Sequence, residues 1–313
     1  MQAHPRRFRF GVEMGAPFDG MSWAESARAV ESLGYSTLFV PDHLHSPMGP
    51  IAAMTAAAVA TTTLHVAPLV LACDFRNPAV LAKELATVDV LSGGRLEVGL
   101  GAGYNPLDYS RSGVTMDAPG VRVSRLIEHT RVLRGLFAGG ETTFEGEHYR
   151  IEALDGTPTP VKPGGPPIIV AGGGARLLRF AAAEADIVGV NPSTAAGRES
   201  VATARDALPT SIDAKFALVR EAAGGRFDGL EFNAWLSFAA ITDDAAGLAG
   251  HLAPRFEATA ADVLDSPIML VGTLDEMAAQ LERRRDRWGY SYTVVPPSQA
   301  YALAPLVARL SGR

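Results

Sequence analysis

The sequence predicts an α/β chain that folds as a (β/α)8 TIM barrel with insertion segments. Apolar runs typical of strands alternate with segments of helical periodicity along all 313 residues, and eight such strand-helix units can be counted. Several strands end in glycine or in a short polar run. Eight units in a chain of this length favour a closed barrel over an open doubly wound sheet. We therefore expect one domain, 1–313, with insertions at about 105–119, 139–165 and 236–267.

The first half of the chain supplies four of the expected units. Ser22 and Glu25 have the spacing of a capping box, and Asn77 followed by Pro78 is a typical helix start. Gly34 and the Gly93-Gly94 pair are expected to end helices. The expected strands are 8–14, 37–40, 64–72 and 95–100, and the expected helices are 22–34, 52–62 and 77–92.

The second half supplies the other four units after a glycine- and proline-rich excursion. Thr273 and Glu276 have the spacing of a second capping box. The expected strands are 167–171, 186–190, 227–232 and 290–295. The expected helices are 121–137, 175–185, 211–223, 273–288 and a short final one.

Composition indicates an ordinary globular chain, with 47% hydrophobic residues, 20% charged residues and a net charge of −6. A single cysteine, Cys73, excludes an intrachain disulfide framework, and the acidic balance argues against nucleic acid as a partner. Residues 51–73 carry no formal charge, but they are interrupted by Thr61, Thr62, Thr63, His65 and Pro68, so we expect a helix and a strand rather than a membrane span. The N-terminus has no apolar run typical of a signal peptide, and we expect a cytoplasmic protein.

Candidate functional residues are those at the carboxyl ends of the strands, where barrel enzymes place their chemistry. These ends are Glu13, Asp42 and His43, Leu69 to Asp74, Gly101 to Asn105, Gly172 to Ala175, Asn191, and Asn233 to Trp235.

Two glycine runs suggest nucleotide chemistry at first sight. Gly172-Gly173-Gly174 stands directly before a helix that begins at Ala175 and carries Arg176, an arrangement suited to a phosphate; a tight turn that needs no ligand is the alternative. The run from Gly99 to Gly103 has the wrong spacing for a dinucleotide fingerprint, and Asn105-Pro106 follows it instead of a helix.

The segment Asp42-His43-Leu44-His45 is the other pronounced feature. Two histidines separated by one residue can ligate a metal, but the remaining histidines fall elsewhere in the pattern, and we expect no metal site. Asp42 is instead expected to accept a hydrogen bond from His43 and fix its tautomer, as a positioned acid or base requires. A structural histidine at a strand end is the alternative, and Glu13 is either an acid or a rim charge.

Three motifs together resemble the luciferase-like monooxygenase superfamily, and more narrowly its branch that uses the deazaflavin coenzyme F420. They are PDH at 41–43, RNPAVLAKELATVDVLSGGRLEVGLGAGY at 76–104 and IIVAGGG at 168–174. The resemblance spans Phe8 to the last strand and independently implies a barrel.

The resemblance implies a role for each candidate position. The cofactor ring is expected across the barrel mouth, with Asp42 and His43 beside its reactive centre and Tyr104 and Asn105 facing it. The strand ending Leu69, Val70, Leu71, Ala72 is expected to bulge behind the ring, often through a non-prolyl cis peptide. The phosphate is expected at Gly172, Gly173, Gly174, Ala175 and Arg176, and the ribityl chain or ring at Asn191.

The reaction that the resemblance implies is hydride transfer between C5 of F420 and a small organic substrate. His43, with Tyr104 or Glu13, is expected to handle the proton. Reduction of an activated C=C or C=N bond is favoured over alcohol oxidation. Tyr104 and Pro47 stand where relatives that oxidise glucose 6-phosphate have an acidic residue and a tryptophan, so sugar-phosphate dehydrogenation is not expected.

Two other functions stay open at this point. One is an FMN-dependent monooxygenase of the same superfamily, and the other is a non-catalytic flavin-binding protein. The resemblance also implies a homodimer through the helices near Ala52 and Pro78.

Overall fold

The computed structural model describes residues 4–195 and 200–313. The chain divides into two compact units, which are described separately. The first unit contains residues 14–31 and 37–170, and the second contains residues up to Glu13, residues 32–36 and residues 171–313.

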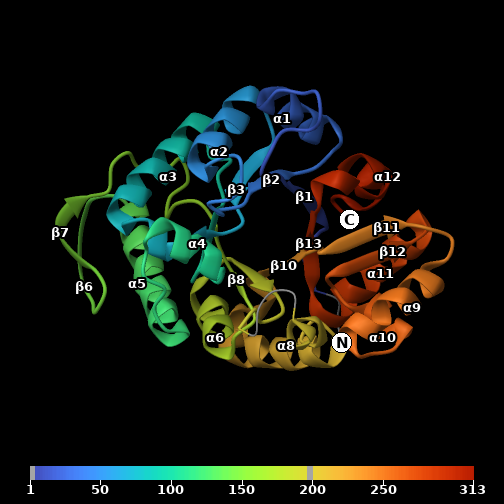
Figure 1. Cartoon of the computed structure of the whole chain (residues 1–313). Coiled ribbons are helices and arrows are strands. Elements are labelled where there is room, and N and C mark those ends of the chain that lie inside the picture. The colour runs from blue at the N-terminus through green and yellow to red at the C-terminus, as the bar shows by residue number, and fades with distance from the viewer. Residues whose placement is uncertain (1–3, 196–199) are drawn as a thin grey trace. The chain divides into compact units, whose positions relative to one another are not determined.

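The first unit contains short parallel strands covered by helices. Strand β2 pairs with β3, and β5 pairs with both β4 and β8. Helices α2, α3 and α5 lie side by side in that order (Figure 1). Its elements are α1 (Trp23–Ser32), β2 (Thr37–Val40), α2 (Pro50–Ala60), β3 (His65–Pro68), β4 (Leu71–Ala72), α3 (Pro78–Ser92), β5 (Val98–Gly101), α4 (Pro106–Ser112), α5 (Pro119–Phe137), β6 (Glu141–Glu145), β7 (Arg150–Asp155) and β8 (Ile168–Gly172), the last ending in the second unit.

Local signals set the start and end of α3 as expected. The Asn77 side chain accepts from the Ala79 N–H, Pro78 occupies the first turn, and Gly93 adopts a left-handed φ of 67° that ends the helix. The strand expected at 95–100 begins only at Val98. Arg95 lies in the turn before it, where its guanidinium donates to the carbonyls of Ser92 and Leu64.

The strand expected at 64–72 is divided in two, β3 and β4. The Leu69–Val70 peptide between them is cis, which confirms the non-prolyl cis peptide expected in this segment. The glycines of β5 give this region room: a Cβ on Gly99 would lie 2.0 Å from the Pro68 oxygen, and one on Gly101 would lie 2.5 Å from Val70. These glycines therefore serve close packing, which agrees with the rejected dinucleotide fingerprint.

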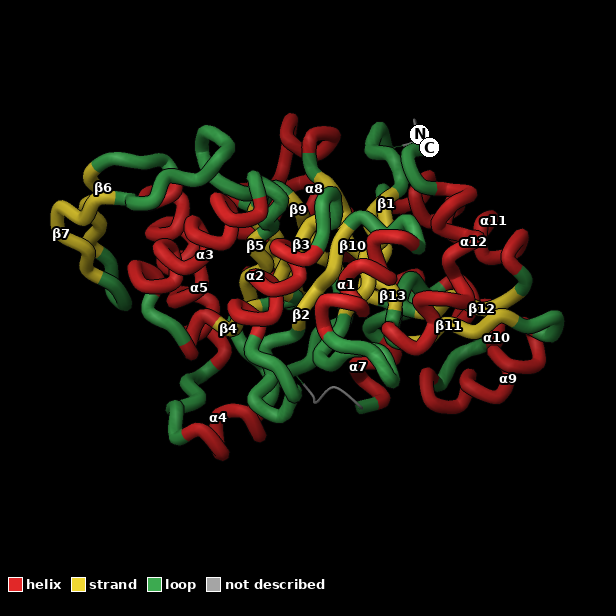
Figure 2. Tube along the Cα trace, turned by 90° about the horizontal axis from the view of Figure 1, so that it is seen from above, coloured by secondary structure: helices red, strands yellow, loops and turns green. Residues whose placement is uncertain are grey.

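Two of the expected insertions belong to the first unit. The segment 105–119 contains α4, so the expectation that Asn105-Pro106 stands in place of a helix is wrong: Asn105 caps this helix and Pro106 occupies its first turn. The segment 139–165 contains an antiparallel hairpin of β6 and β7. The hairpin extends beyond α3 and α5 in both views (Figures 1 and 2).

The second unit contains four parallel strands in the order β1-β13-β10-β9. Phe10, Phe232 and Tyr292 are among its fully buried side chains. The elements are β1 (Arg9–Glu13), α6 (Ala175–Glu184), β9 (Ile187–Val190), α7 (Val201–Arg205), α8 (Pro209–Ala223), β10 (Glu231–Trp235), β11 (Phe238–Ile241), α9 (Ala245–Phe256), α10 (Ala260–Asp265), β12 (Met269–Gly272), α11 (Leu274–Trp288), β13 (Tyr290–Val295) and α12 (Ala300–Leu310).

Two sequence-based expectations for the second unit differ in detail from the structure. The strand expected at 227–232 begins at Glu231, because Gly224–Gly229 forms a 3-10 helix. The expected insertion at 236–267 contains not only helices α9 and α10 but also strand β11. This strand pairs in parallel with β12 beside α9 and α10 (Figure 2). The capping box of Thr273 and Glu276 at the start of α11 is confirmed.

The uncharged run 51–73 falls in α2, β3 and β4, as expected for a buried helix and strand. Across residues 4–195 and 200–313, the helices are all too short or too polar to cross a bilayer.

Glu31 of α1 holds the loop between α2 and β3. Its Oε1 accepts the backbone N–H groups of Thr62, Thr63 and Leu64 at 2.9, 2.6 and 3.0 Å. Burial alone would raise the pKa of this carboxyl, but these donors outweigh it and lower the pKa from 4.5 to about 2.

This depressed pKa predicts an acid-sensitive contribution to stability. Because the folded pKa lies below the ordinary value, the stabilisation is complete above pH 4.5 and is lost as the pH falls towards 2. We expect Glu31→Gln to lower the free energy of unfolding at pH 7. We also expect this free energy to decrease less steeply in the variant as the pH falls, which urea denaturation at pH values from 7 to 2 measures. The exposed Glu84→Gln is the control, and equal pH slopes for wild type and Glu31→Gln would contradict the assignment.

Candidate functional site

His43 of the first unit lies at the centre of a hydrogen-bonded chain. It follows β2, and its Nδ1 lies 2.7 Å from Oδ2 of Asp108 in α4. Its Nε2 lies 3.2 Å from the Tyr104 hydroxyl, which follows β5. A carboxylate only accepts hydrogen bonds, so Nδ1–H donates to Asp108 and the Nε2 of neutral His43 accepts from Tyr104. The arrangement leaves one ring nitrogen with a lone pair for proton transfer.

Asp108 is held in its ionised form. Burial favours the neutral acid, but hydrogen bonds from His43, the Leu44 N–H and Asn105 lower the pKa of this carboxyl below its usual range. The side chain is only 6% exposed. Asp108 therefore fixes the tautomer and the orientation of the His43 ring.

The expectation that Asp42 accepts from His43 is wrong. Asp42 is buried and forms a two-pronged ion pair with Arg76, at 2.6 and 2.8 Å, and it also accepts the Ala72 N–H at 3.0 Å. These donors occupy both carboxylate oxygens. Asp42 thus ties the end of β2 to β4 and to the start of α3, and Asp108 takes the role expected of it.

One other expected residue of the first unit contacts this chain, and the rest lie on β4 and the segment beside it. Asn105 caps α4 by accepting from Leu107 and donates to Asp108 at 3.0 Å. Leu69 and Val70, joined by the cis peptide, are half-buried, and Leu71 and Ala72 are buried in β4. Cys73 is buried, and burial raises the pKa of its thiol, which excludes it as a nucleophile at neutral pH.

The second unit contains the glycine turn. Gly172 ends β8 and Gly174 is the N-cap of α6, which has no side-chain cap hydrogen bond. A Cβ on Gly173 would lie 2.3 Å from the Ser193 nitrogen and 2.5 Å from the Asn191 oxygen, whereas one on Gly174 would meet nothing within 4 Å. Open space therefore lies beside this helix N-terminus, where Ala175 and Arg176 are exposed, as an anion site requires.

Asn191 closes this turn through its backbone. Its N–H donates to the Gly172 carbonyl at 3.1 Å, and its own carbonyl accepts from Lys215 at 3.0 Å. Lys215 also bonds to Asp206 at 2.5 Å and is buried. Lys215 and Asp206 were not among the residues expected at the site from the sequence. Nothing in their spacing indicates that α8 reaches the end of β9.

Glu13 accepts a hydrogen bond from the indole N–H of Trp235. Both residues end strands of the second unit, β1 and β10, which are separated by β13. The indole therefore positions this carboxylate. Trp235 belonged to the expected strand ends but had been given no role.

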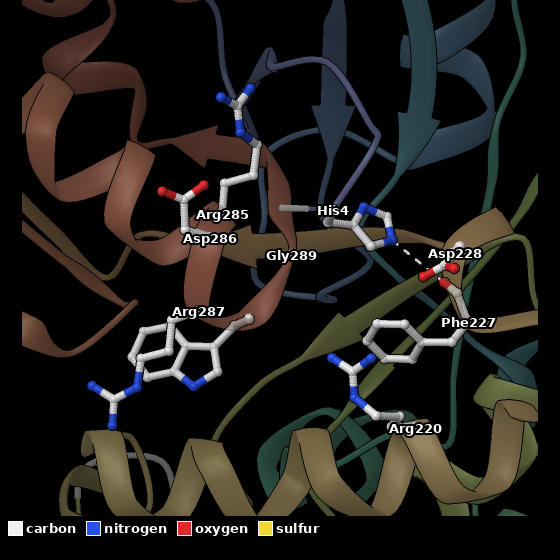
Figure 3. A pocket seen from close by; sticks show the side chains of 9 residues that line it. His4, Arg220, Phe227, Asp228, Arg285, Asp286, Arg287 and Gly289 are labelled. Atoms are coloured by element: carbon white, nitrogen blue, oxygen red, sulfur yellow. Dashed lines mark hydrogen bonds between the residues drawn. The ribbon is translucent and has the colours of Figure 1, made fainter. Parts of the chain in front are cut away.

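A pocket of about 210 Å³ lies at the opposite ends of these strands, between the residues that precede β10 and β13 (Figure 3). His4 donates to the Phe227 carbonyl, and the Arg220 guanidinium lies 3.8 Å from the centre of the Phe227 ring. These contacts stabilise the packing, and barrel enzymes carry out their chemistry at the other strand ends. We do not assign a reaction to this pocket.

Known proteins are similar to this chain in sequence and in fold. The family described as luciferase-like monooxygenase matches residues 8–291. An F420-dependent glucose-6-phosphate dehydrogenase of Mycobacterium avium is 34% identical over 173 residues, which cover 52% of this chain and 50% of the relative. The match thus spans half of that relative.

Solved structures confirm the barrel fold expected from the sequence. The coenzyme F420-dependent tetrahydromethanopterin reductase of Methanopyrus kandleri matches 98% of this chain and 99% of its own, with a TM-score of 0.74 and 17% identity. The monooxygenase RslO1 of Streptomyces bottropensis matches 96% of this chain and 98% of its own, with a TM-score of 0.72 and 22% identity. At sequence identities of 17% and 22%, the likeness to these two structures shows the fold alone.

Proposed function

The chain belongs to the luciferase-like monooxygenase family, and on this premise we propose that it is an oxidoreductase dependent on coenzyme F420. The single observation that carries the proposal is the chain Asp108–His43–Tyr104, which prepares one imidazole nitrogen for proton transfer. The F420 dependence named for two of the relatives above favours this cofactor.

The cofactor would supply hydride transfer at its C5 atom, and the protein would supply binding and proton handling. His43 takes up or delivers the proton at Nε2 while Asp108 holds Nδ1–H. Tyr104 shares the proton through its hydroxyl, and Glu13 is the second candidate acid. Asp42 acts indirectly, by holding the backbone at Ala72.

The same proposal assigns the cofactor contacts. In the second unit, the exposed N-terminus of α6, with Gly172, Gly173, Gly174, Ala175 and Arg176, would bind the phosphate through backbone N–H groups and the helix dipole, and Asn191 would contact the ribityl chain or ring. In the first unit, the ring would be contacted by Leu69, Val70, Leu71, Ala72, Tyr104 and Asn105.

We expect the purified apoprotein to quench the fluorescence of F420 with a micromolar dissociation constant and to take up no FMN. The physical basis is a ring stacked against protein and a phosphate bound at a helix N-terminus. Titration of the apoprotein with each cofactor measures this directly. Uptake of FMN without F420 binding would instead support the FMN-dependent monooxygenase, a function suggested by the likeness to a monooxygenase.

The substrate class follows from the resemblance alone. We propose a small organic molecule with an activated C=C or C=N bond, which accepts the hydride at carbon and the proton from His43. A panel of enones, enals and imines, incubated with reduced F420, tests it through the return of oxidised F420 fluorescence. A panel of secondary alcohols with oxidised F420 tests the reverse direction. Cofactor binding without turnover on either panel would favour the non-catalytic flavin-binding protein.

We also propose that the chain acts in the cytoplasm as a homodimer through α2 and α3. These helices expose Val59, Val80, Val90 and Leu91, with exposed fractions of 68%, 61%, 46% and 54%. Apolar side chains gathered on adjacent helices are typical of an interface. Light scattering should give twice the mass of 32.9 kDa, and a monomer mass would contradict the proposal.

A further inference from the structure

Two histidines and an aspartate of the first unit gather their ligand atoms at one point. The Nδ1 atoms of His43 and His45 lie 2.7 and 3.5 Å from the two carboxylate oxygens of Asp108. One ligand atom from each of the three residues lies within 4.8 Å of the others. The two imidazole rings stack with their centroids 5.0 Å apart.

The backbone holds these three residues in place. The Ser46 N–H donates to the His43 carbonyl, which forms the turn that brings both imidazoles to the same side. The Leu44 N–H and the Asn105 amide donate to the carboxylate of Asp108. The cluster is therefore largely preorganised, which reduces the entropic cost of binding a ligand.

The three members of the cluster differ in exposure. The His45 side chain is 62% exposed, while those of His43 and Asp108 are 20% and 6% exposed. Solvent therefore reaches the cluster at His45, where a water molecule can serve as the fourth ligand of a bound ion. Nothing in the reaction proposed above uses His45.

Two imidazoles, one carboxylate and one water form a donor set that suits Zn²⁺. We propose that His43, His45 and Asp108 bind Zn²⁺ reversibly and that the bound ion inhibits the enzyme. The ion takes the Nδ1 lone pair of His43, the proton of that nitrogen moves to Nε2, and Nε2 can then no longer accept a proton. The binding step is independent of the proposed function, whereas the inhibition rests on it. No metal site was expected from the sequence, because the remaining histidines fall elsewhere in the pattern. The third ligand is instead a carboxylate, Asp108, which lies 65 residues after His43.

Calorimetric titration of the tag-free, metal-stripped full chain with Zn²⁺ tests the binding step. We expect one ion per chain, with a dissociation constant that rises about tenfold or more in His45→Ala and in Asp108→Asn. His251→Ala, which removes an exposed histidine of α9, is the matched control and should bind as the wild type does. Zinc affinity unchanged in both cluster variants would overturn the site.

Turnover in the presence of Zn²⁺ tests the inhibition. Wild type should lose activity over the same concentration range in which it binds the ion. His45→Ala should keep its basal turnover and require about tenfold more zinc for the same loss. Stoichiometric binding with full wild-type activity would overturn the inhibition. F420 binding, measured separately, reports on the proposed function whichever result zinc gives.

Discussion

Replacing His43 by Ala should reduce turnover by about 10²- to 10⁴-fold, the usual contribution of a positioned acid or base. The hydride can still move within the bound complex, but the proton loses the imidazole that Asp108 and Tyr104 align for it. The measurement is the rate of F420 oxidation with the best substrate of the panel.

Cofactor affinity distinguishes proton handling from binding in this variant. The imidazole contacts the side chains of Asp108, Tyr104 and His45, so we expect His43→Ala to bind F420 within a fewfold of wild type. His45→Ala removes the neighbouring ring and is the matched control for a local packing change. Wild-type turnover in His43→Ala would remove the assignment of His43 as the proton donor or acceptor.

The same chain predicts graded effects in its two other members. Asp108→Asn can still hold the His43 ring, but its amide also donates hydrogen bonds, so the tautomer with Nδ1–H is no longer enforced. Tyr104→Phe removes one hydroxyl from the Nε2 side. We therefore expect both variants to retain more activity than His43→Ala. A larger loss in Tyr104→Phe than in His43→Ala would transfer the proton-handling role to Tyr104.

Local signals allowed most of the fold to be predicted from the sequence. Asn77 and Pro78 mark the start of α3, and Thr273 with Glu276 marks the start of α11, because caps act through residues two or three positions away. The predicted start of the strand at 227 was wrong, because Phe227 is apolar yet lies in a 3-10 helix. Apolar character alone does not tell a buried turn from a strand.

The partners of the site residues could not be predicted in the same way. Asp42 was paired with His43 because the two are adjacent in sequence, but Arg76, 34 residues later, takes its carboxylate. Asp108 lies in the insertion 105–119, where no helix was expected to follow Asn105, and α4 carries it back to His43. Which side chain reaches another depends on how distant elements pack, and residue spacing carries no such information.

Two neighbouring glycines offer the sharpest test of the proposed phosphate turn. We expect Gly173→Ala to destabilise the protein by about 3 kcal/mol and Gly174→Ala by less than about 0.5 kcal/mol. The difference arises because the new methyl group at 173 would lie 2.3 to 2.5 Å from three backbone atoms of Asn191, Pro192 and Ser193. Backbone atoms cannot rotate away as a side chain can. At Gly174 the methyl group would meet only open space, and the extended φ of −79° suits alanine.

Urea denaturation of both apoproteins measures this difference without any cofactor. The new methyl group of Gly173→Ala must also move the loop after β9 away from the glycine turn. The hydrogen bond from the Asn191 N–H to the Gly172 carbonyl joins this loop to the turn. We therefore expect its affinity for F420 to fall together with its stability. Equal stability of the two variants would show that the loop after β9 yields to a methyl group. Reduced stability of Gly173→Ala with unchanged F420 affinity would support the packing role of Gly173. It would contradict the assignment of this turn as the phosphate site.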